Sequence, residues 1–320
     1  MLRIFNILLL LAVLSSSEVL AKNTKHHKTK RTNKKSLKID RFGDEIYVYE
    51  KGDYFDMDIA KRVLKRSIGI IPSDLYHIAS APFKNPQNTL RYMGIVGTIM
   101  AFDKPITTFY QQNIETPLAF YSLPTLFKPT PITSGADGWL VYGSIAQYLG
   151  GFALGDEKTQ VTAIMAMKAI GYSYFIDHVF LKSILGRRRP KSDLYHDYDP
   201  NPTHTSNPHD FSPFQPLHFD AHDGRTSFPS FHLTMYFSVA KVYQEMYDNY
   251  WLPYGALAIV FASNIRGHHH WVGDMVGGAI IGTLIGHEIV SNYRNRYHKG
   301  KASNFNIYPI DNGIGFTYRF

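Results

Sequence analysis

Hydrophobic positions recur at helical spacing through most of this chain. From about residue 56 onward apolar side chains recur at helix spacing, as in the series Ile59, Val63, Leu64 and Ile68. This spacing is typical of an amphipathic helix. Further apolar stretches follow at 90–102, 138–155, 161–185, 231–247, 251–265 and 275–290. The pattern predicts a mostly α fold, a helical bundle of six or more helices, over residues 56–300.

Two of these stretches, 138–155 and 249–265, contain no charged residue. Each falls short of the roughly 20 apolar residues that a membrane-spanning helix needs. They are interpreted as buried core helices, and insertion into a membrane is the alternative.

Two regions interrupt the helical pattern. Residues 191–226 are rich in Pro, His, Asp and Asn, and a polar insertion of this length is usually functional or disordered. A solvated loop is the favoured interpretation, with a lid or a divalent-cation site as alternatives. Residues 301–320 alternate apolar and polar positions around the turn sequence Asp311-Asn312-Gly313, which predicts a C-terminal β-hairpin.

The N-terminal residues 1–21 have the pattern of a signal peptide. Arg3 precedes an apolar run, and Val19 and Ala21 occupy the small-residue positions of a cleavage site. We expect cleavage after Ala21 and a periplasmic or envelope-associated mature protein. A retained N-terminal anchor is the alternative.

The excess of basic residues is confined to one segment. Of the 34 basic residues, eight lie between Lys22 and Lys38 with no acidic residue among them, so 26 remain against 26 acidic residues. Residues 22–55 therefore read as a basic disordered tail and linker, and nucleic acid is not an expected partner. The tail is either a solvated linker or a tether to an anionic membrane or envelope surface. The absence of cysteine excludes a disulfide scaffold and a thiol enzyme.

The first chemically informative motif runs from Lys182 to Pro190. Lys182 and Arg189 lie seven residues apart, so the spacing places both on one helix face, and Pro190 would end the helix. Two cations on one face suit a polyanion such as phosphate. The alternative is that they complement the helix dipole and face solvent.

The second motif, residues 227–232, opens a predicted helix. Ser227 is a candidate N-cap and Pro229 suits the first turn, so the backbone N–H groups near Ser230 and His232 would form an anion site. His232 would then lie beside that site, or be a histidine in an ordinary first turn.

The third motif runs from Ser263 to Asp274 and includes three consecutive histidines. On a helix, His270 and Asp274 would be neighbours four positions apart, and the carboxylate could hold one ring nitrogen while the other acts as nucleophile or base. Adjacent histidines on a helix diverge by about 100° and cannot all converge on a metal. No metal or cofactor is therefore predicted.

In this order the three motifs resemble the type 2 phosphatidic acid phosphatase superfamily, which includes bacterial class A acid phosphatases and vanadium haloperoxidases. The family pattern is Lys, six residues, Arg-Pro; then Pro-Ser-Gly-His; then Ser-Arg, five residues, His, three residues, Asp. The resemblance covers roughly residues 90–290. The matching positions are Lys182, Arg189-Pro190, Pro229-Ser230-Phe231-His232, Ser263-Asn264, His270 and Asp274.

The resemblance implies a metal-independent, two-step phosphoryl transfer. His270 would form a phosphohistidine, Asp274 would orient it, and His232 would protonate the leaving oxygen and then activate water. Lys182, Arg189 and Ser230, with nearby backbone N–H groups, would hold the phosphate. The substrate would be a phosphorylated lipid or a small phosphate ester, and the apolar stretches and basic tail favour an envelope lipid.

Two departures from the family pattern bear on activity. Phe231 replaces a Gly, and Asn264 replaces an Arg, a donor whose loss can cost about 3 kcal/mol in the transition state. Arg266 is a candidate replacement for that donor. The other hypotheses are a catalytically weakened phosphate-binding envelope protein and a vanadate-dependent haloperoxidase.

Overall fold

A computed structural model describes residues 37–39, 45–47, 49–126, 135–217, 225–265, 269–297, 305–310 and 313–318. The expected signal peptide, nearly all of the basic segment 22–38 and Arg266 lie outside these residues.

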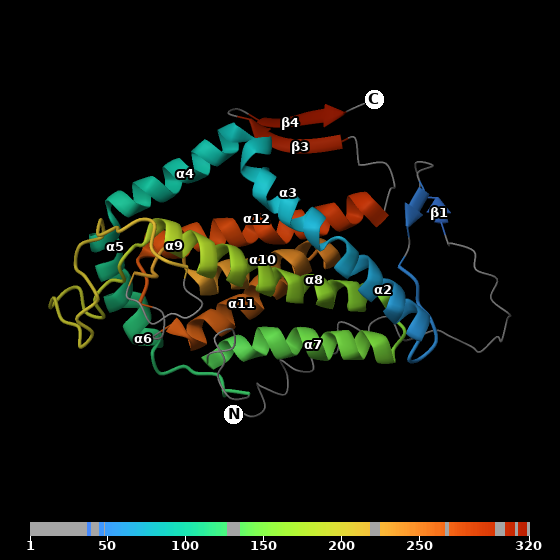
Figure 1. The fold of residues 1–320 in the computed structure, drawn as a ribbon, viewed down its shortest axis with the longest axis horizontal. Coiled ribbons are helices and arrows are strands. Elements are labelled where there is room, and N and C mark those ends of the chain that lie inside the picture. The colour runs from blue at the N-terminus through green and yellow to red at the C-terminus, as the bar shows by residue number, and fades with distance from the viewer. Residues whose placement is uncertain are drawn as a thin grey trace. The chain divides into compact units, whose positions relative to one another are not determined.

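The described part of the chain is mostly helical, which confirms the predicted fold class (Figure 1). The N-terminal half contains β1 (Leu37–Ile39), β2 (Glu45–Tyr47), α2 (Met57–Gly69), α3 (Ile71–Lys84), α4 (Pro86–Ala101), α5 (Asp103–Tyr110), η1 (Gln111–Glu115) and α6 (Thr116–Leu118). There follow η2 (Gly135–Asp137), α7 (Gly138–Ala153), α8 (Glu157–Ser173), η3 (Tyr174–Leu181), α9 (Lys182–Leu185), α10 (Phe231–Tyr247), α11 (Trp251–Ser263), α12 (Val272–Tyr297), β3 (Phe305–Ile310) and β4 (Gly313–Tyr318).

Helices α10 and α12 pack side by side, so closely that their backbones are in contact (Figure 1). A Cβ atom added at Gly282 of α12 would lie 2.2 Å from the carbonyl oxygen of Thr234 on α10, and one at Gly286 would lie 2.4 Å from that of Ser238. Only glycine permits so close an approach. The contact brings the N-terminal ends of both helices, which carry the second and third motifs, next to each other.

Both charge-free segments form helices, α7 and α11, but each is buried along one side only. Leu149 of α7 is 56% exposed and Trp251 of α11 is 91% exposed. The prediction that they are buried core helices is therefore wrong for their outer faces, because the bundle covers just one side of each. Among the described residues, none of the helices combines the length and the hydropathy of a membrane-crossing segment.

The polar insertion is folded back on the first motif. Backbone N–H groups of Arg188, Thr205 and Ser212 donate to the carbonyl oxygens of Asp210, Arg189 and Gly186 respectively. The described part of the insertion is thus tied to the chain by hydrogen bonds and is not a freely solvated loop. Within the described residues no three His, Asp or Glu side chains are grouped to hold a metal ion, and residues 218–224 lie outside them.

Strands β3 and β4 pair antiparallel, with Phe305 opposite Tyr318. The turn residues 311 and 312 lie outside the described residues, so the C-terminal hairpin stays a prediction.

We predict that Gly282→Ala lowers the free energy of unfolding by roughly 1–3 kcal/mol, because the added methyl group forces α10 and α12 apart. The measurement is urea unfolding followed by circular dichroism. Gly171→Ala is the matched control, since its Cβ would meet no atom within 4 Å and alanine favours the helix by up to about 1 kcal/mol. Equal effects of the two substitutions would contradict the packing argument.

Candidate active site

The first motif does not lie on one helix. α9 ends at Leu185, and Gly186 follows in the left-handed region with φ +56°. A Cβ atom at Gly186 would lie 1.9 Å from the carbonyl oxygen of Ser212. The prediction that Lys182 and Arg189 share a helix face is therefore wrong, because the chain leaves the helix before it reaches Arg189.

The two cations nevertheless influence each other in the folded protein. Burial lowers the pKa of Lys182, the charge of Arg189 lowers it further, and the carboxylate of Asp177 opposes both effects. Burial also lowers the pKa of Arg189, to about 10, so this side chain is still protonated at neutral pH. Two buried cations close enough to repel each other make a site that favours an anion.

Each cation has defined neighbours. The Lys182 Nζ atom lies 3.4 Å from His178 Nδ1 and 5.9 Å from the centre of the Phe231 ring. Arg189 donates from Nε and Nη2 to the Thr226 hydroxyl, at 3.3 and 3.2 Å. Phe231, which stands where the family has Gly, is buried with its ring against His178 and next to Lys182.

The second motif begins α10, with Ser230 as the N-cap residue. The prediction that Ser227 is the cap is wrong, because its buried hydroxyl donates to Asp274 Oδ2 at 2.5 Å. The Ser230 N–H donates to the carbonyl oxygen of Asp274. The buried Ser230 hydroxyl has no hydrogen-bond partner among the described residues, so it can serve a bound ligand.

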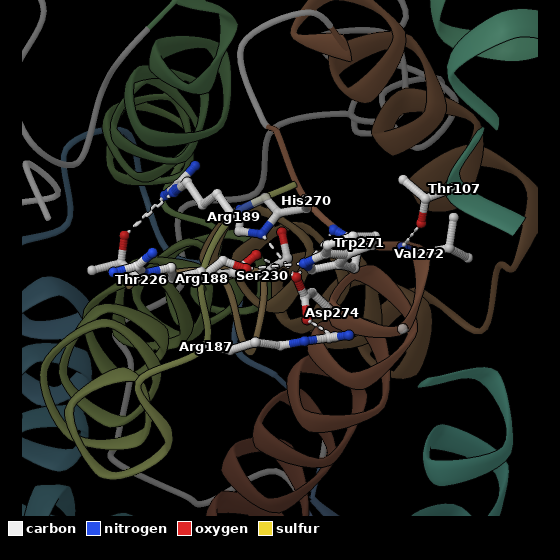
Figure 2. A network of polar contacts seen from close by, with 12 residues as sticks. Thr107, Arg187, Arg188, Arg189, Thr226, Ser230, His270, Trp271, Val272 and Asp274 are labelled. Carbon is white, nitrogen blue, oxygen red and sulfur yellow. Dashed lines mark hydrogen bonds and ion pairs between the residues drawn. The ribbon is translucent and has the colours of Figure 1, made fainter. Parts of the chain in front are cut away.

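The third motif places His270 just before α12 and Asp274 in its first turn. The two residues therefore do not share a helix as predicted. Their side chains still meet, with His270 Nδ1 3.7 Å from Asp274 Oδ2 and both side chains almost fully buried. Figure 2 shows Arg189, Ser230, His270 and Asp274 gathered from separate segments of the chain.

Asp274 is held by several donors besides His270. Its carboxylate accepts from Arg187 Nη1 at 2.5 Å, from Ser227 Oγ and from the Trp271 N–H at 3.0 Å (Figure 2). Burial raises the pKa of Asp274, while the charge of Arg187 and the bond from Ser227 oppose the rise. A carboxylate fixed in this way can hold a histidine ring in one orientation.

Arg187, which was not predicted to have a role, is at the centre of this network. Its side chain is fully buried, and Nη2 donates to Asp103 Oδ2 at 2.8 Å and to the carbonyl oxygen of Pro208 at 2.6 Å. The guanidinium lies 5.4 Å from the centre of the Trp271 ring. Asp103 also accepts from the Gly273 N–H at 2.7 Å. Arg187 therefore connects α5, the insertion and the start of α12.

A second histidine–carboxylate pair was also missed by the sequence analysis. His232 Nε2 lies 3.1 Å from Oδ2 of the buried Asp137 in η2. Nothing in the local sequence around residue 137 or 103 indicates such a role. Arg187 could have been suspected from its place in the Arg187-Arg188-Arg189 run.

The predicted phosphate-binding residues are thus only partly brought together. Arg189 and Ser230 lie beside His270 in Figure 2, and the charge of Lys182 interacts with those of Arg189 and Asp274. The Asn264 side chain instead bonds to Asp137 and Tyr236. Arg266, the candidate replacement for the missing arginine, lies outside the described residues.

We predict that Arg187→Ala lowers the free energy of unfolding by about 3–5 kcal/mol, because it leaves Asp103 and Asp274 buried without their cation. Thermal or urea unfolding measures the loss. Arg188→Ala is the matched control: that side chain is 34% exposed and lies 3.6 Å from Asp210, a surface pair worth about 0–1 kcal/mol. Similar losses for both variants would count against the proposed importance of the buried network.

Comparison with known proteins gives one match. Residues 160–298 match the family model described as the PAP2 superfamily. No curated protein and no solved structure was found to match the chain. The matched segment contains the first motif with Lys182 and Arg189, the second with His232, and the third with His270 and Asp274. The match over residues 160–298 agrees with the resemblance of the three motifs to the type 2 phosphatidic acid phosphatase superfamily.

Proposed function

We propose that this protein is an exported phosphatase that hydrolyses phosphate monoesters or diphosphates of envelope lipids through a phosphohistidine on His270. The superfamily match supports a phosphatase broadly. The observation that supports a phosphohistidine on His270 is its buried pairing with Asp274, whose carboxylate is fixed by Arg187 and Ser227.

In the first step His270 is the nucleophile. Its Nδ1 faces Asp274, so Nε2 is the nitrogen that attacks phosphorus. The P–N bond forms as the bond from phosphorus to the leaving oxygen breaks, and His232 gives that oxygen a proton. The Asp274 carboxylate stabilises the positive charge that develops on His270.

In the second step a water molecule attacks the phosphohistidine. His232, which has lost its proton, takes one from the water as the P–O bond forms and the P–N bond breaks. His270 and His232 return to their starting states, and inorganic phosphate is released. Side chains supply every proton transfer in this scheme, so it needs no metal ion.

The phosphate group is held by charge and by donors. Lys182 and Arg189 neutralise the equatorial oxygens, and the buried Ser230 hydroxyl supplies a further donor. The N–H groups in the first turn of α10 have no intrahelical acceptor and add a positive dipole end. Together these groups stabilise charge where phosphoryl transfer develops it.

An apolar surface on α4 and α5 supports a lipid substrate. α4 has no buried residue and exposes Leu90, Met93 and Ile95 by 67, 64 and 50%. On α5, Phe109 is also exposed, while Thr107 of the same helix accepts a hydrogen bond from the Val272 N–H at the start of α12 (Figure 2). Exposed apolar patches of this kind mark interaction sites, including those for membranes.

Export and surface attachment are supported by the N-terminal sequence alone. Residues 1–21 have the signal-peptide pattern, and residues 22–38 carry the basic run. Each Lys or Arg near an anionic lipid surface contributes about 1 kcal/mol.

We predict that the purified mature chain releases phosphate without added metal, and that His270→Ala lowers the rate at least about 10³-fold because it removes the nucleophile. The measurement is phosphate release from an aryl phosphate and from vesicles containing phosphatidic acid or a lipid diphosphate. His287→Ala is the matched control, since His287 also pairs with a carboxylate, Glu245, but is half exposed on α12.

Two further observations complete this test. The double substitution Met93→Glu, Ile95→Glu would lower turnover of the vesicle substrates and leave turnover of the aryl phosphate unchanged. No turnover of any substrate, by a folded chain that binds phosphate or vanadate, would favour the weakened phosphate-binding protein. Peroxide-dependent halogenation after vanadate loading would favour the haloperoxidase.

We predict that kcat/KM falls at high pH as Lys182 loses its charge. Burial lowers the pKa of Lys182, so the alkaline limb lies below the ordinary lysine range. Lys182→Arg would keep its charge and move this limb to higher pH, measured as kcat/KM against pH with 2,4-dinitrophenyl phosphate, whose leaving group departs without a proton from His232. Burial raises the pKa of Asp274, so the acid limb lies above the ordinary aspartate range and is the same in both proteins. An alkaline limb unmoved by Lys182→Arg would assign it to another group.

A further inference from the structure

The Asn264 side chain forms hydrogen bonds with groups other than the residues proposed to bind phosphate. Its Nδ2 donates to Asp137 Oδ1 and reaches the Tyr236 hydroxyl, both at 3.0 Å. Its Oδ1 accepts from the Ala136 N–H at 3.0 Å. Asn264 is thus bonded to η2 and to α10 from its place at the C-terminal end of α11.

These bonds converge on one carboxylate. Asp137 is fully buried, and its Oδ1 accepts from the Tyr236 hydroxyl as well as from Asn264. Its other oxygen, Oδ2, faces His232 Nε2 at 3.1 Å. Burial raises the pKa of Tyr236 far above its ordinary value, so the hydroxyl remains a donor to Asp137. The carboxylate is held on one side by two donors and meets His232 on the other.

The geometry of α10 makes this arrangement specific for His232. Tyr236 lies one helical turn after His232, so both side chains project from the same face toward Asp137. Asn264 and the Ala136 N–H close the network from outside α10. A change at Asn264 would therefore reach His232 through Asp137, without contact between Asn264 and the substrate.

We propose that Asn264 is a positioning residue, which fixes Asp137 so that this carboxylate holds Nε2 of His232 and sets the orientation of the ring. Proton exchange with the leaving group and with water then uses Nδ1 of His232. The proposal rests on the phosphatase function above and deepens it. It gives position 264, where the family motif has an arginine for phosphate, a role in proton transfer.

Such a role predicts that the loss of activity depends on the leaving group of the substrate. A poor leaving group such as phenoxide needs its proton in the transition state, whereas 2,4-dinitrophenoxide leaves without one. The quantity to compare is kcat/KM, because it reports the step in which the leaving group departs. A loss of phosphate binding would lower kcat/KM for both substrates alike.

The test compares phenyl phosphate with 2,4-dinitrophenyl phosphate in Asn264→Ala and Asp137→Asn. We expect kcat/KM for phenyl phosphate to fall at least about tenfold in both variants. This loss is a part of the roughly 10²–10⁴-fold that general acid catalysis contributes. We expect kcat/KM for the dinitrophenyl ester to fall less than about threefold. Equal losses on the two esters would overturn the proposal, as would an Asn264→Arg variant with higher activity on both.

Asn292→Ala is the matched control. Asn292 is also a buried asparagine whose Nδ2 donates to a buried carboxylate, Asp74 Oδ1, at 2.7 Å. The other partners of Asp74 are Tyr172 and Lys168, neither of which belongs to the network around Asp137 and His232 described above. We expect this variant to lose stability while keeping the wild-type ratio between the two esters.

A second readout does not depend on turnover. In protein with ¹⁵N-labelled histidine, we expect His232 to keep a proton on Nε2 both before and after Nδ1 gives up its proton, and this Nε2 signal to change in Asn264→Ala and persist in Asn292→Ala. A His232 signal unaffected by Asn264→Ala would overturn the positioning role even in an active enzyme. If wild type released no phosphate while the His232 signal responded as expected, the phosphatase proposal would fail and the positioning of His232 by Asn264 would stand.

Discussion

The buried guanidinium of Arg187 is the interaction on which the candidate site depends. It binds Asp103 on α5, Asp274 on α12 and the carbonyl oxygen of Pro208 in the insertion. Two carboxylates buried so close together would repel each other and would lose their hydration without this cation. Their neutralisation allows Asp274 to be placed beside His270, and it ties the insertion to the bundle.

The site contains two histidine–carboxylate pairs, which are supported from different sides. Asp274 is fixed by Arg187 and Ser227, and Asp137 is fixed by Tyr236 and Asn264. The close packing of α10 on α12 through Gly282 sets the separation of the two pairs, because it joins the helices that begin beside them. Bundle packing and site geometry are therefore consequences of the same contact.

The support for the site extends beyond the segment that matches the superfamily. Asp103 and Asp137 precede residue 160, where the match begins, and yet each holds a residue of the three motifs. The same N-terminal part contributes α4, whose apolar side chains are exposed. In the proposed function this part of the chain both orients the site and faces the lipid phase.

The helical fold class and the three motifs could be read from the sequence, because helical periodicity and motif spacing are local patterns. The ends of the helices and the hydrogen-bond partners of individual side chains could not be read in this way. Gly186 ends α9 because a carbonyl group of the insertion occupies the space of a side chain, and Ser227 bonds to a carboxylate 47 residues away instead of capping its own helix. Only the tertiary structure shows that Asn264 bonds to Asp137 and that Arg187 bonds to both Asp103 and Asp274. The two residues of each of these contacts lie more than 80 positions apart in the chain. Contacts at such separations are set by how the helices pack, and no local pattern of side chains encodes them.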